Sequence, residues 1–291
     1  MYWIILGICS QILSGISATA DKIILKRSVP EPASNAFFLA LSGLAALVLA
    51  PFGFHTPNTS TILFALAAGG VYFIGMLLYF NALNGAEASS ILPIHAGWLP
   101  IATLAFTISF APDAMRSYQM VPFALLVLGT LIIARNGSTK PPSASTIIYA
   151  LLSAVLLGLS NVLSRRVFFA SGFISGFITI KIAVALAALI FMVIPAYRRK
   201  VARPHSKPAG TAFFLNRVLA GVASVIFFYA LSIGNPPILD ALRGIAIATI
   251  FILSAGLSAL APRLLQEDFT PKHAVQKILG LGVIAAAIAF L

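Results

Sequence analysis

Residues 173–197 read FISGFITIKIAVALAALIFMVIPAY, an almost uninterrupted apolar run with a single charge at Lys181. The hydrocarbon core of a bilayer is about 30 Å thick, so a helix that crosses it needs about 20 mostly apolar residues. This stretch meets that requirement, and nine others do the same. The sequence therefore predicts an all-α polytopic membrane protein with ten transmembrane helices. The expected spans are 2–20, 35–54, 61–81, 88–110, 117–134, 146–164, 173–197, 211–233, 237–260 and 274–291.

The composition agrees with a membrane protein and argues against a nucleic-acid partner. Of the 291 residues, 60% are hydrophobic and 9% are charged, whereas a soluble domain has about 25% charged residues. The net charge of +12 comes mostly from short loops rather than from one exposed face. Basic loops fit the positive-inside rule and contact with anionic lipid. We therefore expect a lipid bilayer as partner and no nucleic acid.

No sequence motif predicts a cofactor, a metal site or an enzymatic activity. The sequence has no His, Cys and carboxylate cluster with metal-ligand spacing, no phosphate-binding glycine loop and no G-x-S-x-G motif. The single cysteine, Cys9, excludes an intrachain disulfide. Residues 18–20 (ATA) resemble a signal-peptidase site, but no basic residue precedes the apolar run, and Ser10, Gln11 and Ser14 interrupt it. We therefore expect no cleavage there.

Two short matches indicate that the chain repeats itself. Gly15-Ile16-Ser17 corresponds to Gly158-Leu159-Ser160 at an offset of 143 (158 − 15), and residues 79–83 (YFNAL) correspond to 227–231 (FFYAL) at an offset of 148 (227 − 79). Coincidence is the alternative, because these residue types are common in apolar helices, but the shared order favours a true repeat. The expected units are residues 1–137 and 144–291. Each holds five helices, so the second unit enters the membrane from the opposite side, which predicts inverted repeats.

Five-plus-five helices in 291 residues, the Gly158-Leu159-Ser160-Asn161 turn and the Phe-Phe-Tyr-Ala-Leu run at 227–231 resemble the EamA-type branch of the drug/metabolite transporter superfamily. The resemblance covers the whole chain and implies a transporter of amino acids, metabolites, nucleotide sugars or drugs, without naming the cargo. Two positions depart from the pattern. Ser14 stands where the family usually has Trp, and the acidic-basic pair after the ninth helix is loosened to Arg263 and Glu267-Asp268.

Loop charge predicts the orientation of the helices in the membrane. The loops after the odd-numbered helices hold twelve basic residues, and the even-numbered loops hold three, Arg116, Arg165 and Arg166. Positive loops stay in the cytoplasm, so both termini are expected outside, although relatives are usually drawn with termini inside. We expect the protein to lie in a cell membrane, namely the bacterial inner membrane. The odd-loop residues are Lys22, Lys26, Arg27, Arg135, Lys140, Arg198, Arg199, Lys200, Arg203, Lys207, Arg263 and Lys272.

Charged and polar residues at membrane depth are the candidate site. A charge at a helix centre costs about 2.5–3.5 kcal/mol on insertion scales, so its presence is a hypothesis of function. The offset of 148 relates His95 to Arg243 (95 + 148), so each half places a basic or protonatable group at the same internal position. The substrate-binding candidates are Arg243, His95, Asp240, Tyr79, Asn81, Trp98, Asn161, Lys181 and Tyr229.

The basic residues and His95 also have structural explanations. Arg243 lies three residues after Asp240, on the same face of a helix, so it is a candidate partner of that acid. His95 lies between Pro93 and Trp98 and suits helix packing equally well. Lys181 has a stem long enough to carry its charge to the headgroups, as has Arg217, which lies close to the expected boundary. Pro93, Pro100, Pro236 and Pro237 are expected to break or kink helices four and nine.

The surplus of positive charge at depth favours an anionic or carboxylate-bearing cargo, such as an amino acid or an organic or phosphorylated metabolite. Asp240 is the one acid clearly inside a segment, and a carrier of cations usually needs an unpaired acid. We expect a secondary transporter, an exporter or exchanger of a small polar metabolite, acting by alternating access as a monomer or weak dimer. A membrane-embedded enzyme acting on lipid and an ion channel remain the alternatives.

Overall fold

The structure is a computed structural model that describes residues 2–24, 31–86, 88–110, 115–134, 142–202, 210–260 and 271–291. Within these ranges the chain is helical, and no strand is present. The helices are α1 Tyr2–Ile24, α2 Pro32–Ser42, η1 Gly43–Phe52, α3 Thr59–Gly85, α4 Ala88–Phe110, η3 Ser117–Gln119, α5 Met120–Ala134, α6 Ala144–Phe191, α7 Pro195–Val201, α8 Gly210–Ile233, α9 Pro236–Ala241, α10 Arg243–Leu260 and α11 Pro271–Ala289.

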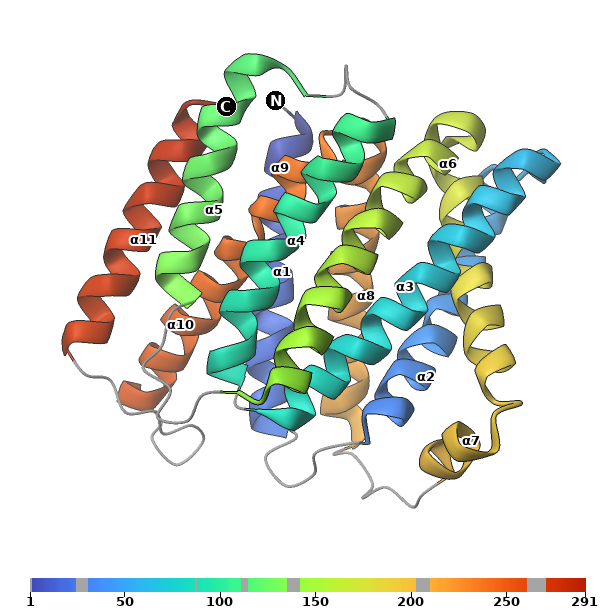
Figure 1. Cartoon of the computed structure of the whole chain (residues 1–291), viewed down its shortest axis with the longest axis horizontal. Helices are drawn as coiled ribbons and strands as arrows, with labels where there is room; N and C mark the ends of the chain where they lie inside the picture. The colour runs from blue at the N-terminus through green and yellow to red at the C-terminus, as the bar shows by residue number, and fades with distance from the viewer. Residues whose placement is uncertain are drawn as a thin grey trace.

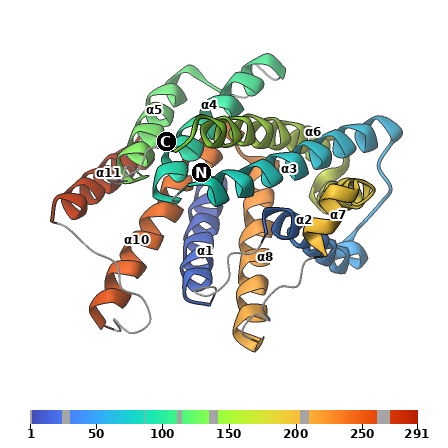
Figure 2. The same ribbon diagram turned by 60° about the horizontal axis from the view of Figure 1, so that its bottom comes forward.

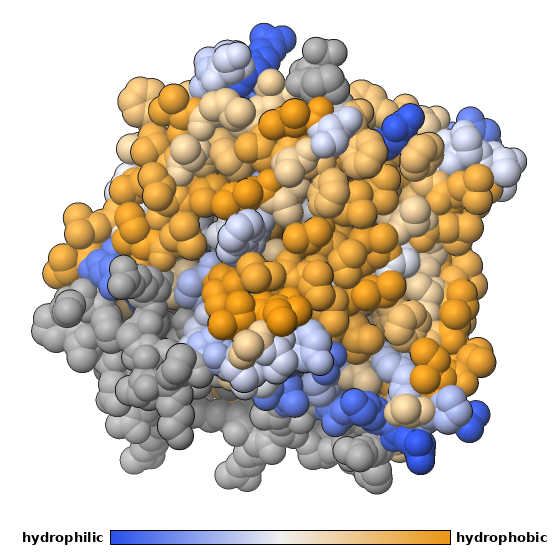
Figure 3. All heavy atoms as spheres, in the orientation of Figure 1, coloured by the Kyte–Doolittle hydropathy of each residue, from blue (hydrophilic) through white to orange (hydrophobic). Residues whose placement is uncertain are grey.

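Eight of the described helical stretches are long and apolar enough to cross a membrane. The longest, α6, has 48 residues, and α11 adds a shorter apolar stretch at Val275–Ala289. Large hydrophobic side chains such as Val48, Phe169 and Val193 are exposed, and Figure 3 shows a wide hydrophobic band between more hydrophilic upper and lower margins. Exposed apolar surface on this scale indicates contact with lipid. The prediction of an all-α multi-pass membrane protein is therefore confirmed at this level.

The 48-residue α6 is two helices joined by one residue. Gly172 alone has non-helical dihedral angles, with φ 69° and ψ 171°, in the left-handed half of the map that glycine tolerates best. Figure 1 shows the α6 ribbon rising, turning and descending to α7. Residues 165–171, which were expected to form a loop between the spans 146–164 and 173–197, are therefore helical. The turn is limited to Gly172 and is much tighter than predicted.

The helices alternate in direction, and both termini lie at one end of the bundle (Figure 1). The first helix starts at that end, whereas the first part of α6, which opens the second expected unit, starts at the opposite end (Figure 1). Helix α7, with Arg198, Arg199 and Lys200, also lies at the end opposite to the termini. Of the other odd-loop basic residues, Lys22 and Lys272 belong to α1 and α11. Lys26, Arg27, Arg135, Lys140, Arg203, Lys207 and Arg263 lie outside the described residues, as do Glu267 and Asp268.

The helices pack in two rows. Figure 2 shows α1 between α8 and α10 in one row, and α6 between α3 and α4 in the other, in agreement with their contacts. Glycines allow close approach at two of these contacts. A methyl group on Gly15 would lie 2.8 Å from the carbonyl oxygen of Ala246 in α10, and one on Gly158 would lie 2.9 Å from the backbone nitrogen of Thr103 in α4.

Candidate functional site

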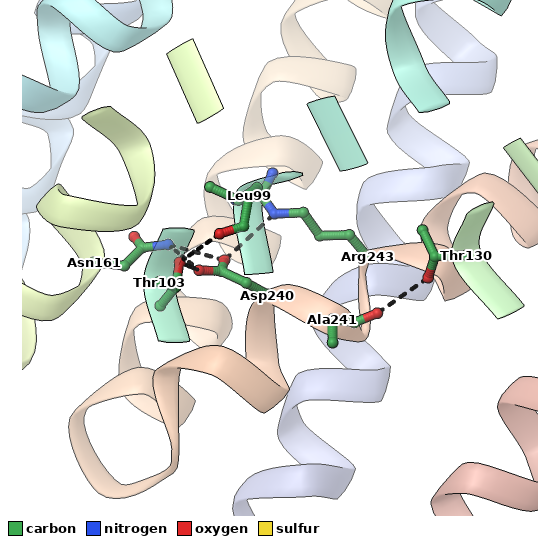
Figure 4. Close-up of polar contacts among 7 residues, drawn as sticks. All are labelled: Leu99, Thr103, Thr130, Asn161, Asp240, Ala241 and Arg243. Carbon is green, nitrogen blue, oxygen red and sulfur yellow. Dashed lines mark hydrogen bonds and ion pairs between the residues drawn. The ribbon is translucent and has the colours of Figure 1, made fainter. Parts of the chain in front are cut away.

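The most deeply buried acid of the described residues, Asp240, is the centre of a polar cluster between three helices. Its carboxylate is inaccessible to solvent. It accepts hydrogen bonds from Thr103 Oγ1 of α4 at 2.7 Å and from Asn161 Nδ2 of α6, which lies 2.9 Å and 2.8 Å from its two oxygens. Figure 4 shows these side chains and Arg243 converging on it. A buried carboxylate needs such partners, because an unpaired charge in a low-dielectric interior is costly.

The backbone of the ninth expected span is arranged to put Asp240 and Arg243 at a break. Pro236 and Pro237 occupy the first turn of the short helix α9, where proline is tolerated. The chain turns at Leu242, and α10 begins at Arg243. The carbonyl of Ala241, close to this break, accepts a hydrogen bond of 3.2 Å from Thr130 Oγ1 of α5. This span is therefore broken as predicted, but at Leu242 rather than at the prolines, and α4 runs through Pro93 and Pro100 as one helix.

Arg243 reaches the same carboxylate and keeps most of its hydrogen-bonding capacity unused. Its Nε atom lies 3.5 Å from Asp240 Oδ1, and the side chain is 34% exposed, in contrast to the fully buried acid. The guanidinium lies 5.7 Å from the centre of the Phe227 ring. Within the part of the chain that the structure describes, its Nη nitrogens have no hydrogen-bond partner. The planar fork that recognises carboxylate and phosphate is therefore free.

His95 and Tyr79 belong to the surroundings of Arg243. The two rings lie 4.6 Å apart at an angle of 50°. His95 is buried, and its Nε2 atom has no hydrogen-bond partner among the described residues. The charge of Arg243 acts electrostatically on His95, on Tyr79 and on Tyr72. The structure thus brings together His95, Tyr79, Asn161, Asp240 and Arg243 from the predicted set.

Lys181 lies among three aromatic rings instead of reaching the headgroups. Its Nζ atom is 5.6 Å from the ring centre of Tyr72, 5.1 Å from that of Phe177 and 4.6 Å from that of Phe228. No carboxylate pairs with it in the described ranges. The face of an aromatic ring attracts a cation, so this cage compensates for the missing counterion.

Three predicted residues lie elsewhere. Asn81 donates a hydrogen bond of 2.7 Å to the carbonyl of Leu77 in its own helix. Trp98 is 50% exposed and shares an outward face of α4 with Ile101 and Ile108, so no contact joins it to Arg243. Tyr229 packs edge-on against Phe173, with ring centres 5.1 Å apart.

Tyr229 and Phe173 line a pocket of about 340 Å³ beside the turn at Gly172, together with Gly53 and His55. His55 is held there by Ser175, whose hydroxyl lies 3.0 Å from Nδ1 and accepts a hydrogen bond of 3.0 Å from the His55 backbone nitrogen. No contact of Tyr229 in the described ranges leads to Arg243. The aromatic run at 227–231 therefore contacts two different regions. Phe227 lies beside the Arg243 guanidinium, and Tyr229 lines this pocket.

The sequence analysis did not predict two contacts. Thr103 was not a candidate, although it gives Asp240 its shortest hydrogen bond. Arg217 was expected to reach the headgroups, but it forms an ion pair with Asp21 of α1. Asn216 supports this pair with hydrogen bonds of 2.8 Å to Asp21 Oδ1 and 3.1 Å to the carbonyl of Ser17. Both contacts join distant helices, so no spacing along the chain reveals them.

The described residues contain no group of three or more His, Cys, Asp or Glu side chains arranged to hold a metal ion. Comparison with protein-family models gives no match, and neither does comparison with curated proteins. One solved structure, described only as the crystal structure of a protein, superposes with a TM-score of 0.69 at 17% identity, over 99% of this chain and 96% of the other. A likeness at this identity shows a shared fold along the whole chain and carries no information on cargo.

Proposed function

We propose that this protein is a secondary transporter of the EamA type that moves a small anionic metabolite by alternating access. The observation that carries the proposal is the unused guanidinium fork of Arg243, partly exposed and held beside a buried acid in the bundle. The unpartnered Nε2 of His95 adds a polar group in the surroundings of Arg243, and Lys181 adds a second buried cation in its aromatic cage. A site with surplus cationic donors at membrane depth suits a carboxylate or phosphate group.

We infer further that ten spans form two inverted five-helix repeats, residues 1–137 and 144–291. Division of α6 at Gly172 and inclusion of Val275–Ala289 would raise the eight apolar stretches to ten (8 + 1 + 1). The two rows support a two-fold relation, because α1 packs on α8 and α10 as α6 packs on α3 and α4. The repeat-related Gly15 and Gly158 each make the close approach in their row.

Contacts at positions related by the offset of 148 add support for the repeat. This offset relates Tyr79 to Phe227 and His95 to Arg243 (79 + 148 and 95 + 148). In the first half the ring of Tyr79 contacts His95, and in the second half the ring of Phe227 contacts Arg243. Two halves related in this way suit a mechanism in which they rock about a site that both contribute to.

Counterflow in proteoliposomes tests the transport proposal without knowledge of the coupling ion. Vesicles are loaded with an excess of one unlabelled probe, and uptake of the same labelled probe is followed. Glutamate, succinate, inorganic phosphate and glucose 6-phosphate serve as anions, with choline and glucose as controls. Transient accumulation of at least one anion, and of neither control, is expected. Accumulation of choline alone would contradict an anion carrier, and accumulation of no probe beside accessible, folded protein would count against transport of these classes.

Orientation is tested by reporter fusions. A fusion within 199–207 should report a cytoplasmic position, and one after Leu291 an external position, because the basic residues of α7 lie opposite to the termini. A cytoplasmic reporter after Leu291 would reverse the proposed orientation and leave the cargo proposal unaffected.

A further inference from the structure

Asp240 depends on a single cation for its charge balance. It is fully buried, and its other partners, Thr103 and Asn161, are neutral donors. Neutral donors ease the burial of a carboxylate but do not cancel its charge. Arg243 therefore has two roles that conflict if the cargo is an anion, because the same guanidinium balances Asp240 and would bind the cargo.

The geometry of the ion pair makes this conflict direct. Arg243 engages Asp240 only through Nε, at 3.5 Å, which is long for a charge-assisted hydrogen bond. An anion on the free Nη fork would draw the guanidinium charge toward itself and bring a second negative charge close to Asp240. Two negative charges that share one cation in a low-dielectric site favour the uptake of a proton by one of them.

No other described charge is placed to take over from Arg243. On the helices packed against α9, α4 contributes His95, which lies beside Tyr79, and α5 contributes no titratable side chain. On α1 and α8, Asp21 and Arg217 pair with each other. Lys181 of α6 sits in its aromatic cage, Arg165 of α6 lies over Phe169, and Arg166 lies over Phe64. Tyr229 of α8 faces the pocket at Gly172.

We propose that Asp240 is the proton-coupling site of this transporter, taking up one proton from solution when an anionic group binds to Arg243. The inference rests on the proposed function. In the step, a carboxylate and a proton form a carboxylic acid, and the ion pair between Asp240 and Arg243 is exchanged for one between the cargo and Arg243. The loaded site gains one negative and one positive charge and keeps its net charge. Transport of a monoanion would then be electroneutral proton symport.

Proton uptake on binding is the first test. Purified protein in lightly buffered detergent receives inorganic phosphate, succinate or glutamate at fixed pH, from about pH 5 to about pH 8, and a pH indicator records the protons taken up. The parent should take up about one proton per anion bound, after subtraction of the probe's own titration. By linkage, its affinity for the anion should rise as the pH falls, by up to about tenfold per pH unit.

Asp240→Asn separates coupling from binding. Asparagine keeps the shape and removes both the charge and the proton site. Its Oδ1 can still accept from Asn161 Nδ2, and its Nδ2 can donate to Thr103 Oγ1, whose hydroxyl lies 2.9 Å from the carbonyl of Leu99. This variant should bind the anion at least as tightly as the parent at neutral pH, with no proton uptake and no pH dependence. In proteoliposomes it should retain counterflow and lose accumulation driven by an imposed pH gradient. A merely structural role for Asp240 would instead lower both activities together.

Asp21→Asn is the matched control, because Asp21 forms a second ion pair of an acid with an arginine among the described residues. It should leave the number of protons per anion unchanged. If Asp240→Asn does not fold, Thr103→Val replaces it. Loss of the 2.7 Å hydrogen bond disfavours the carboxylate, so the pH at which proton uptake is half-maximal should shift upward.

Three results would overturn the inference. The first is anion binding without proton uptake by the parent. The second is Asp240→Asn with the proton uptake of the parent, and the third is Thr103→Val with an unchanged pH profile. In each case anion binding itself would survive, so the proposed function would stand. Failure of every anion probe to bind to folded parent protein would instead contradict the proposed function, and the coupling inference would fall with it.

Discussion

Two contacts at repeat-related positions have the same form and different chemistry. In the first half, the aromatic ring of Tyr79 lies 4.6 Å from the ring of His95, which is buried and pairs with no acid among the described residues. In the second half, the ring of Phe227 lies 5.7 Å from the guanidinium of Arg243, and Asp240 lies three residues earlier. At the position related to Asp240 by the offset of 148 (240 − 148), the first half has Leu92.

This difference shows how a repeated scaffold carries an asymmetric site. The glycines and small residues that set helix distances recur in both halves, because packing imposes the same demand on each. The permanent charge, its acid and the donor Asn161 belong to the second half, whereas the first half supplies the other donor, Thr103. The first half presents a hydroxyl group and an imidazole instead. A cargo that contacts both halves would bind a guanidinium group at one end and the polar rings of Tyr79 and His95 at the other.

The largest expected effect comes from Arg243→Lys. Lysine keeps a charge beside Asp240 but loses the planar fork, so the initial rate of counterflow for the responding anion should fall about 10- to 100-fold, the equivalent of a lost hydrogen bond to a charged group. Arg217→Lys serves as the matched control and should fall much less. Rates are compared at equal amounts of folded protein. If Arg243→Lys transports at the rate of the parent, the guanidinium fork does not recognise the cargo, and the chemical difference between the halves does not explain recognition.

The next effect is on stability and uses two asparagines. Asn161 donates to the buried carboxylate of Asp240, whereas Asn81 donates only to Leu77 in its own helix. Asn161→Ala should lower the free energy of unfolding by about 2–3 kcal/mol, because the acid loses a donor, and Asn81→Ala by less than about 1 kcal/mol. Reversible unfolding in mixed micelles measures both. Equal losses of unfolding free energy in the two variants would mean that the hydrogen bond to Asp240 contributes no more to stability than the one to Leu77.

Glycine substitutions test the likeness of the halves rather than their difference. Gly15→Ala and Gly158→Ala each bring a methyl group to within 3 Å of backbone atoms on a neighbouring helix, so both should destabilise by about 1–3 kcal/mol. Gly70 and Gly221 have open space around them, and alanine there should be neutral or stabilising by up to about 1 kcal/mol. A large loss at Gly158 with none at Gly15, in the same unfolding assay, would break the proposed two-fold relation.

The smallest expected effect comes from His95→Gln. The side chain has no hydrogen-bond partner on Nε2 to lose within the described structure, and glutamine keeps a polar group beside Tyr79. The counterflow rate should fall less than about tenfold, within the range of one neutral hydrogen bond. A loss as large as that of Arg243→Lys would instead place the main recognition of the cargo in the first half.

The spans were predictable because burial in lipid requires long apolar helices with internally satisfied backbones. The expected segments at 88–110 and 117–134 coincide with α4 and with η3 plus α5. Composition alone did not reveal that the sixth and seventh segments meet at one residue. Serine and arginine at 164–166 looked like a loop, but they continue α6, and the Arg166 guanidinium lies 4.5 Å from the Phe64 ring centre.

The site was predictable in its charged members and in part of its polar surroundings, namely Asn161, His95 and Tyr79. Arg243 and Asp240 stand out because ionisable residues are costly at membrane depth, and their spacing of three indicated that they meet. Thr103 and Tyr72 did not stand out, because threonine and tyrosine are inexpensive there and their importance depends on which helix faces which. Trp98 shows the opposite case, since a large aromatic residue at the right depth lies on the outward face of α4. The direction of a side chain is a property of the packed bundle.

The turn at Gly172 also bears on how such a chain enters a membrane. On the side of the termini, the described connections are short, namely 53–58, Gly172 alone and 234–235. With the proposed orientation, the helical pairs joined by these three connections pass little polar chain through the hydrocarbon during biogenesis. The 48 residues of α6 would then enter the bilayer as one helical hairpin. Arg165 and Arg166, close to its turn, would be the main charged residues to cross the hydrocarbon. The turn at Gly172 would then make the two helical parts of α6 insert together, in addition to determining their arrangement in the fold.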